Sequence, residues 1–544
     1  MIKKVFNFLD KDISGLHKAA YILGFSAFLS QILALLRDRI LAHTFGAGET
    51  LDIYYSAFRI PDFIFITVAS IVSISVLIPY LSQETNVEKT KEFMNEVFSV
   101  FLVLILFISV IVFFFIPKLV PFIFSGFSAD MLEQVISLSR IMLLSPVLLG
   151  LSNFFTSIIQ TRNKFFIYAL SPLLYNIGII IGILLYYPLW GISGLALGVV
   201  TGAFLHLIIQ LPSIYKLRFI PKFTSHIKLS RVKNIIRLSL PRTLAVSSSS
   251  LAILVLISIA THMKEGSIAI FNFAYVLQSI PLSIIGISYT TAAFPMLSKI
   301  SIDKKSEFMR QVGITSKHIL FWTIPAMVLF FILRAQIVRT VLGSGEFSWV
   351  DTRLTAACLA IFAISIPAQS LILFFVRGYY AAGITKRPVL INMFSSMFII
   401  ILVFLFKWVF TTTPILLMSL GYLLKIADIS DIQVIILPLS FTIATIINIF
   451  LLYFFIQKDF QYLSKDLSRG FFQICIASLI MGIVAYFSLK IWNNVFDINT
   501  LVGIFLQGLL SGLTGIVVWV ITLKMLDNEE MNVITYSIRE RFRK

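Results

Sequence analysis

The stretch that decides the fold runs from Ser30 to Pro61 and reads SQILALLRDRILAHTFGAGETLDIYYSAFRIP. Its first half is an apolar run that reaches Leu36 and then meets Arg37, Asp38 and Arg39 in succession. An ionised group at membrane depth costs several kcal/mol, so such groups usually face a charged partner or a watery cavity. Three consecutive ionisable residues at the end of an apolar run therefore require an explanation in terms of topology or function.

The second half of the stretch passes through a Gly-rich turn at residues 46–48 into another apolar run. That run begins with Asp52 and carries Arg59 just before Pro61. We predict that both runs are helices and that this hairpin forms one wall of a polar cavity inside a membrane protein. The alternative is that residues 37–39 sit at the membrane edge and only anchor the topology.

Composition places the chain among polytopic membrane proteins. Of its 544 residues, 58% are hydrophobic and 13% are charged, and the mean hydropathy is +0.95. A soluble protein of this size could not bury so much apolar surface. The net charge of +18 does not indicate a nucleic-acid partner, because the basic residues occupy short loops between apolar runs. The two cysteines, Cys358 and Cys475, make neither a disulfide framework nor a metal-binding spacing.

Apolar segments long enough to cross about 30 Å of hydrocarbon recur along the chain and predict an all-α fold with about fourteen transmembrane helices. These segments lie at 19–44, 53–81, 95–124, 130–159, 165–187, 192–214, 235–262, 267–297, 312–341, 352–376, 388–410, 432–456, 471–491 and 500–524.

The loops between these segments alternate in charge. One set is rich in Lys and Arg, around residues 3–4, 89–91, 162–164, 216–233, 299–305, 377–387 and 458–469. The other set, at 43–51, 186–191, 261–267 and 493–499, is poor in basic residues. By the positive-inside rule the first set is cytoplasmic, which puts both termini in the cytoplasm, as an even number of crossings requires.

The chain also repeats itself. Three residues of its first half recur in the second half, in the same order and at a nearly constant offset: Pro79 as Pro295, Gly126 as Gly345, and Pro146 as Pro367. Helices six crossings apart point the same way, so we predict two six-helix lobes related by a pseudo-two-fold axis along the membrane normal. Chance recurrence of Pro, Gly and Ser at helix ends is the alternative.

The predicted organisation has six parts. They are an amphipathic lead at 1–18, an N-terminal lobe at 19–216, a basic cytoplasmic linker at 217–234, a C-terminal lobe at 235–457, two extra helices at 470–524 and a basic cytoplasmic tail at 525–544. An insertion at 411–432 contains an apolar run, 415–424, that we predict to be a helix on the outer face.

The residues point to a transporter and not to an enzyme. No catalytic grouping, phosphate-binding Gly-Lys loop or metal-ligand spacing occurs, so no cofactor is expected. Duplicated bundles with a midplane cleft are typically alternating-access transporters. Arg37, Arg39 and Arg59 favour an anionic cargo, because guanidinium grips phosphate bidentately. Asp38 and Asp52 could orient these arginines, or the pairs could only tie the first two helices together.

Several motifs carry a family resemblance. They are the stretches 35–38, 45–48, Asp52 and 57–61, supported by 163–165 with Pro172 and Asn176, 210–212, 295–299, 378–380 and 386–388. With these motifs the chain resembles MurJ-type lipid II flippases (the MviN family) of the multidrug/oligosaccharidyl-lipid/polysaccharide exporter superfamily. The resemblance covers most of the first twelve predicted helices, in order.

The resemblance implies a bacterial cytoplasmic-membrane flippase that moves lipid II, the lipid-linked peptidoglycan precursor, outward for cell-wall synthesis. It implies that Arg37, Asp38, Asp52 and Arg59 are charged cavity positions. It also implies that the last two helices border a groove for the polyprenyl tail. Lipid II, membrane lipids and wall-synthesis proteins are the partners expected on this basis.

The chain departs from the family pattern where arginines are implied. Gln31, Phe65 and Val276 stand at such positions, and Ile66, Ser70 and Ile71 complete an altered segment after Pro61. The loss leaves several readings open: a different lipid-linked sugar as cargo, compensation by Arg242, or a protein that no longer transports. Arg242 is also explained as a positive-inside anchor. Three hypotheses therefore stand: a lipid II flippase, an exporter of another lipid-linked oligosaccharide or a drug/ion antiporter, and a non-transporting scaffold of wall synthesis.

Overall fold

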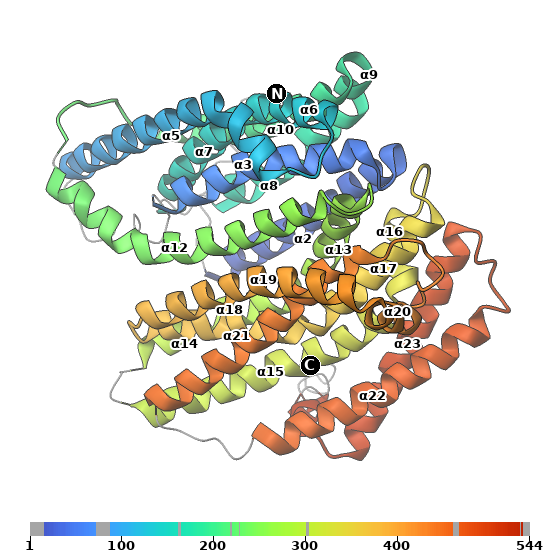
Figure 1. Cartoon of the computed structure of the whole chain (residues 1–544). Helices are drawn as coiled ribbons and strands as arrows, with labels where there is room; N and C mark the ends of the chain where they lie inside the picture. Colours follow the sequence, from blue (N-terminus) through green and yellow to red (C-terminus); the bar gives the residue numbers. More distant parts are fainter. Residues whose placement is uncertain are drawn as a thin grey trace, which may run out of the picture. The chain divides into compact units, whose positions relative to one another are not determined.

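The computed structural model describes residues 16–71, 87–161, 165–217, 220–227, 229–300, 304–460, 467–533 and 535–536. Within these ranges the chain forms helices and no strand, which confirms the all-α prediction. The chain divides into two compact units at residues 268/269 (Figure 1). Residues 1–15 of the predicted lead at 1–18 and the basic end of the tail from 537 onward lie outside the described residues.

The first unit contains the hairpin and the helices that pack around it (Figure 1, blue to green). Its elements are α2 (Leu16–Phe45), α3 (Glu49–Ile71), α5 (Val87–Ile123), α6 (Ala129–Met142), α7 (Leu144–Thr161), α8 (Phe165–Ile181), the π-helical turn η1 (Gly182–Tyr186), α9 (Tyr187–Trp190), α10 (Ile192–Ile208), α11 (Leu211–Lys216) and α12 (Leu229–Ala260).

The second unit follows in green to red in Figure 1. Its elements are α13 (Ser267–Pro281), the π-helical turn η2 (Leu282–Ile287), α14 (Ser288–Lys299), α15 (Lys305–Ile332), α16 (Arg334–Leu342), α17 (Trp349–Ile364), α18 (Ile366–Ala381), α19 (Lys386–Thr412), α20 (Pro414–Leu424), the 3₁₀ turn η3 (Gln433–Ile435), α21 (Ile436–Phe460), α22 (Leu467–Trp492) and α23 (Leu501–Met525).

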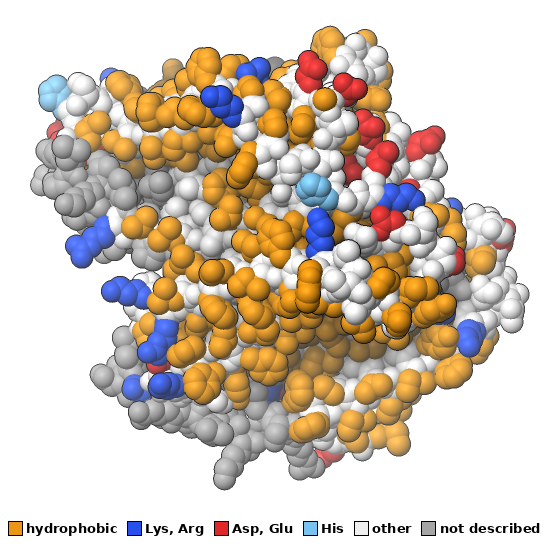
Figure 2. Space-filling view, viewed as in Figure 1, with side chains coloured by type: hydrophobic (Ala, Val, Ile, Leu, Met, Phe, Trp, Pro, Cys, Tyr) orange, Lys and Arg blue, Asp and Glu red, His pale blue; other side chains and the backbone are white. Residues whose placement is uncertain are grey.

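The described residues include eleven helices long and apolar enough to cross a membrane, or twelve if the bent pair α17–α18 counts as one span. Helix α2 covers the predicted segment 19–44, and α3 covers 53–71 of the segment 53–81, whose residues 72–81 lie outside the described residues. Each of the fourteen segments therefore overlaps helix in the described part of the chain, although the count of fourteen spans is not itself established. Hydrophobic side chains cover most of the face in Figure 2, and residues such as Phe114 (71% exposed) suit contact with lipid.

Two predictions of helix extent are corrected by the structure. The predicted segment 312–341 is broken at Leu333, between α15 and the short α16. Several helices also begin before their apolar segment: α5 starts at Val87 and α12 at Leu229, inside the predicted linker. Hydropathy marks only the part of a helix that lies in hydrocarbon, whereas backbone hydrogen bonding continues through polar turns beyond it.

The internal repeat has a local structural counterpart in each unit. Ser128 caps α6 by accepting a hydrogen bond from the Met131 amide, and Ser348 caps α17 by accepting one from the Asp351 amide. Each capped helix is then interrupted, at Leu143 in the first unit and at Ser365 in the second. Matching caps followed by matching breaks support duplication. The Pro79 member of the repeat lies outside the described residues.

Small residues let the helices of the first unit approach closely. A Cβ added at Gly198 of α10 would lie 2.5 Å from the Cα of Gly182, and one at Gly178 would lie 2.2 Å from the Cα of Gly202. Moving apolar side chains from lipid into a helix contact gains little free energy. Close van der Waals contact between helices therefore supplies much of the free energy of their association. The contact of α10 with α8 and η1 therefore depends on glycine at four positions.

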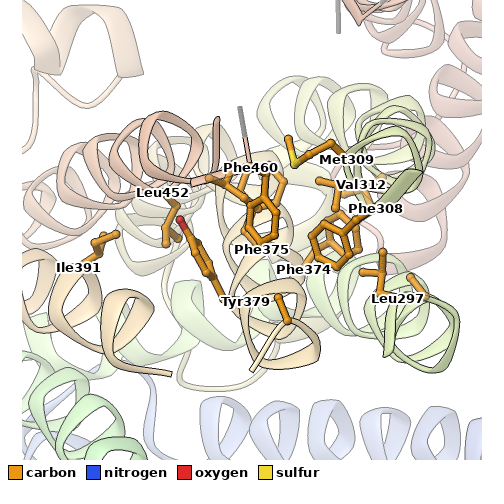
Figure 3. Close-up of a cluster of buried hydrophobic side chains, with 14 residues drawn as sticks. Leu297, Phe308, Met309, Val312, Phe374, Phe375, Tyr379, Ile391, Leu452 and Phe460 are labelled. Carbon is orange, nitrogen blue, oxygen red and sulfur yellow. The ribbon is translucent and has the colours of Figure 1, made fainter. Parts of the chain in front are cut away.

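The second unit is centred on a cluster of large apolar side chains (Figure 3). Phe308 and Phe460 stack at 4.8 Å between ring centroids, and the ring of Tyr379 lies 6.3 Å from that of Phe460. The Tyr379 hydroxyl donates to Asp459, so the one polar atom of this ring is paired. The cluster joins α14, α15, α18, α19 and α21.

Replacing Gly198 with alanine should destabilise the protein by about 1–3 kcal/mol, because the added methyl group overlaps the backbone at Gly182. Gly378→Ala is the matched control: it is also a buried helical glycine, but a Cβ there meets no atom within 4 Å. The thermal unfolding midpoint in detergent should fall for Gly198→Ala only. Equal midpoints for the two variants would contradict the close contact.

Candidate functional site

Arg37 is held by two helices at once. Its Nε donates to Asp38 Oδ1 at 2.8 Å, and its Nη1 donates to Asn176 Oδ1 of α8 at 3.1 Å. Consecutive residues of a helix point in different directions, so the long arginine side chain must fold back to reach Asp38. Asn176 in turn donates to the carbonyl of Pro172, which fixes its amide. The guanidinium therefore has a defined position between α2 and α8.

The Arg37–Asp38 pair is largely removed from solvent, with side chains 20% and 3% exposed. The second carboxylate oxygen of Asp38 is buried and has no hydrogen-bond partner in the described part of the chain. The arginine stabilises the charge of this carboxylate, because bulk water cannot reach either group to solvate it in place of its partner. The pair is thus an ion pair inside the helical bundle and not an exposed anchor at its rim.

Arg59 belongs to the same electrostatic group. Tyr55 interacts with both Arg37 and Arg59, and Arg59 also interacts with Asp62 one turn further along α3. Tyr55 of α3 is therefore within electrostatic range of both arginines. Of the other predicted residues, Arg39 is half-buried on α2, and Arg242 falls in α12 with its side chain outside the described residues.

A cavity of about 350 Å³ lies inside the first unit, between α3, α7, α8 and α10. Five of its lining residues are polar, and they are Asp62, Ser145, Asn153, Tyr175 and His206. Phe65 is also part of the wall, at a position where the family resemblance implies arginine. Tyr175, one of the lining residues, interacts electrostatically with Arg37, so the cavity lies within electrostatic range of the Arg37–Asp38 pair.

Asp52 has a different role from the other predicted residues. Its Oδ2 accepts a 2.7 Å hydrogen bond from the Gly266 amide, and Glu265 Oε1 accepts one from the Glu49 amide at 2.8 Å. Gly266 has φ +85° and a Cβ there would lie 2.0 Å from the Ala47 carbonyl oxygen, so only glycine fits. These contacts join the turn after α2 to the loop after α12, and we call them the loop latch.

The second unit contains an apolar groove of about 420 Å³. It is lined by α15, the end of α17 and α22, through Met327, Val328, Phe331, Ile332, Ile364, Leu479, Gly482, Ile483, Tyr486 and Phe487. Helix α23 packs on α22 but contributes none of these residues. The Lys490 ammonium lies 5.0 Å from the Tyr486 ring centroid, so one end of the groove carries positive charge.

Sequence reasoning missed three residues of this site: Asp62, Tyr175 and Asn176. Asp62 could have been found, because it is an ionisable residue in an apolar run. Asn176 contributed to the family resemblance, but nothing in the sequence pairs it with Arg37, 139 positions away. Among the described residues no group of three or more His, Cys, Asp or Glu could hold a metal ion.

Comparison with known proteins gives a consistent result. A family model described as "Lipid II flippase MurJ" matches residues 41–507. A probable lipid II flippase MurJ of Borreliella burgdorferi is 27% identical, covering 88% of this chain and 96% of that protein. The lipid II flippase MurJ of Burkholderia cenocepacia is 25% identical over 66% of this chain and 72% of its own length.

Solved structures agree with these relatives. The structure titled "Lipid II flippase MurJ, inward closed conformation" superposes with a TM-score of 0.75 at 27% identity, covering 93% of this chain and 98% of that one. An inward-facing multidrug-resistance MATE transporter matches with a TM-score of 0.61 at 16% identity, covering 80% of this chain and 96% of that one. The second likeness concerns the fold alone.

Asp38→Ala should destabilise the protein by about 3 kcal/mol, because Arg37 would stay inside the bundle without its carboxylate. The double variant Arg37→Ala/Asp38→Ala should lose less stability than the sum of the losses in the two single variants, since it leaves no uncompensated charge. SDS-induced unfolding of the three purified variants measures the cycle. Strict additivity would show that the pair does not act as a unit.

Proposed function

The chain belongs to the MurJ family of lipid II flippases, and we propose that it moves lipid II from the inner to the outer leaflet of the bacterial cytoplasmic membrane by alternating access. Transport, and not catalysis, is the expected activity, and it would serve cell-wall synthesis. A polar, charged headgroup cannot cross hydrocarbon unaided, because transfer without hydrogen-bonding partners is prohibitive. A protein that lines the route with fixed donors removes that barrier.

The observation that carries the proposal is the placement of Arg37. A guanidinium fixed by Asp38 and Asn176 keeps its charge within the bundle and has further N–H donors for a pyrophosphate. Arg59 lies in the same electrostatic group and adds a second cation. Two arginines in one unit suit a ligand with two adjacent phosphates, because each phosphate can take a bidentate pair.

The loop latch supports the predicted orientation. It joins the loops 43–51 and 261–267, both of which are poor in basic residues and were assigned to the outer side. In our proposal both termini are cytoplasmic and the latch closes the first unit on its outer side. An alternating-access protein must break such contacts to release cargo outward, and hydrogen bonds from single backbone amides are weak enough to exchange with water.

The apolar groove is the proposed seat of the polyprenyl tail. Its lining carries almost no polar atoms, so an isoprenoid chain could stay in contact with apolar surface while the headgroup moves. The family resemblance implies such a groove beside the last two helices. The groove described here is formed by α22 with α15 and α17. An inside-negative potential would assist export of an anion by about 2.3 kcal/mol per charge per 100 mV.

A second candidate is export of another lipid-linked oligosaccharide. Phe65 favours it, because an aromatic ring lines the cavity where the family resemblance implies arginine. Replacing a cation by an aromatic ring in the lining of the cavity would alter which headgroup is accepted while leaving the pyrophosphate site intact. A drug/ion antiporter and a non-transporting scaffold of wall synthesis have no comparable observation in their favour.

Arg37→Ala and Arg59→Ala should each fail to complement cells depleted of the protein, because each removes a cation from the pyrophosphate site. Lipid II headgroups should then stay inaccessible to an externally added headgroup-modifying enzyme. Arg37→Lys keeps the charge but loses the planar guanidinium that donates hydrogen bonds to both Asp38 and Asn176, so it should retain partial activity.

Membrane levels of each variant must match those of the wild type for this comparison. Full complementation by both alanine variants would point to a scaffold and contradict transport through this site. Loss of complementation with normal lipid II exposure would favour a different lipid-linked cargo.

Ile483→Trp should slow transport of lipid II, because the larger ring fills the apolar groove. Ile476→Trp on the same helix is the control: its side chain is 48% exposed, against 51% for Ile483, but it does not line the groove. Initial rates of headgroup exposure in proteoliposomes separate the two. Equal slowing by both variants would show that the groove does not hold the tail.

A further inference from the structure

Three basic side chains border the apolar groove of the second unit, and the proposed mechanism uses none of them. The Lys490 ammonium lies 5.0 Å from the centroid of the Tyr486 ring, and the Lys425 ammonium lies 5.8 Å from the same centroid. The Arg334 guanidinium lies 5.3 Å from the centroid of the Phe331 ring. Both rings line the groove, so cations from three separate elements border one apolar surface.

The protein does not neutralise these cations. In the described part of the chain, no carboxylate lies within ion-pair distance of Lys425, Lys490 or Arg334. Arg334 donates a hydrogen bond to the Phe331 carbonyl at 2.8 Å, which is a neutral acceptor. Two ammonium groups beside one ring repel each other, and an anion bound between them would replace that repulsion with attraction.

Lys425 is held in place by a helix far from it in the sequence. Helix α20 ends just before it, and Lys425 has φ +63°, a left-handed conformation that usually belongs to glycine. Arg353 of α17 donates to the Lys425 carbonyl at 2.5 Å and to Asp428 Oδ2 at 2.6 Å. These bonds fix the loop that carries Lys425 beside α22. Backbone strain of this kind is found often at ligand-binding sites.

In the proposed orientation the three cations lie on the outer side of the membrane. Helices α15 and α22 start near the basic loops 299–305 and 458–469, which were assigned to the cytoplasm, and they run toward Arg334 and Lys490. The insertion 411–432, which carries Lys425, follows the opposite end of α19 from its basic start. Lipid headgroups lie at the membrane surface and their chains in hydrocarbon. The groove and its cations therefore match a lipid of the outer leaflet.

We propose that Lys425, Lys490 and Arg334 bind the pyrophosphate of an isoprenoid lipid whose chain lies in the groove. The apolar lining accounts for the chain, and the cations account for the headgroup. A pyrophosphate carries more than one negative charge, so it matches three cations better than the single charge of a phospholipid phosphodiester does. The identity of the chain rests on the proposed function. The inference adds a binding site for the headgroup after it has crossed the membrane.

The exposure of the two lysines sets how firmly such a headgroup is held. Both Lys425 and Lys490 are exposed, whereas Arg334 is half-buried. Water and salt compete with an anion at exposed ammonium groups, so affinity should fall as ionic strength rises. A site of this kind stabilises the exported lipid without trapping it, because part of the binding energy is lost to solvent screening.

The first test locates the lipid in the full-length protein. A farnesyl pyrophosphate analogue that carries a photoreactive diazirine is irradiated with the protein in nanodiscs, and labelled peptides are identified by mass spectrometry. The wild type should be labelled on α22 between Leu479 and Phe487. Lys490→Gln and Lys425→Gly should each weaken binding about tenfold, measured by titrating this labelling. Lys407→Gln removes the same charge from α19, which contributes no lining residue, and should be labelled like the wild type.

The glycine substitution separates loss of charge from loss of fold. Glycine adopts a positive φ without steric cost, so Lys425→Gly removes the ammonium while suiting the backbone. Its thermal unfolding midpoint should be no lower than that of the wild type. The labelling of Lys490→Gln and Lys425→Gly should also depend less on salt than that of the wild type, because each variant has one cation fewer at the site.

Competition identifies the occupant. Unlabelled farnesyl pyrophosphate should displace the probe from α22, whereas phosphatidylglycerol and inorganic pyrophosphate at the same concentration should displace much less. Equal displacement by phosphatidylglycerol would show that the groove takes any anionic lipid. Equal displacement by inorganic pyrophosphate would show that the chain is not recognised. Either result would overturn the proposal.

Two further outcomes separate this site from the proposed function. Labelling of α22 that is unchanged in both Lys490→Gln and Lys425→Gly, or reduced equally in Lys407→Gln, would overturn the headgroup site and leave the groove as the seat of the tail. Absence of lipid II transport by a protein whose labelling depends on the two lysines would reject the proposed function and leave the isoprenoid pyrophosphate site standing.

Discussion

The ion pair between Arg37 and Asp38 is the constraint on which the site depends. Neither charge can be left alone inside a helical bundle, so the two must stay together and the surrounding helices must stay in register with them. Asn176 extends this requirement to α8, and Tyr55 extends it to α3. Three helices are thereby fixed around one guanidinium. A charge that would otherwise destabilise the membrane domain becomes the element that positions its polar interior.

The glycine contacts of the first unit serve the same end. Because lipid does not drive apolar helices together, α10 associates with α8 and η1 through backbones that approach at Gly178, Gly182, Gly198 and Gly202. This close contact brings Tyr175 and His206 to one cavity from neighbouring helices. The network from Thr156 through Gln210 to His206 then satisfies the polar groups that face inward. Packing and hydrogen bonding therefore build the cavity jointly, and a larger residue at these glycines would move its walls.

Much of the fold followed from the sequence, because a membrane span needs a fixed length of apolar residues and every predicted segment overlaps helix among the described residues. The repeat was predicted from recurring Pro and Gly residues, and the caps at Ser128 and Ser348 that the structure adds lie two to three residues after Gly126 and Gly345. The break at Leu333 was not, because no proline or glycine marks it. The charged residues of the hairpin were identified, but their partners were not. Asn176 reaches Arg37 only through tertiary packing, which no spacing in the chain encodes.

The charge balance of α3 decides how the cavity can treat an anion. Where the family resemblance implies arginine, this chain has Phe65, which lines the cavity together with Asp62. In the proposed function Arg37 and Arg59 bind an anion, and a transporter must also weaken that binding to release its cargo. Asp62 follows Arg59 by one turn on α3, so the same helix carries a carboxylate close to a cation that the proposed function uses. A helix that carries charges of both signs attracts an anion less strongly than one that carries arginine alone, and this balance favours release at the end of each cycle.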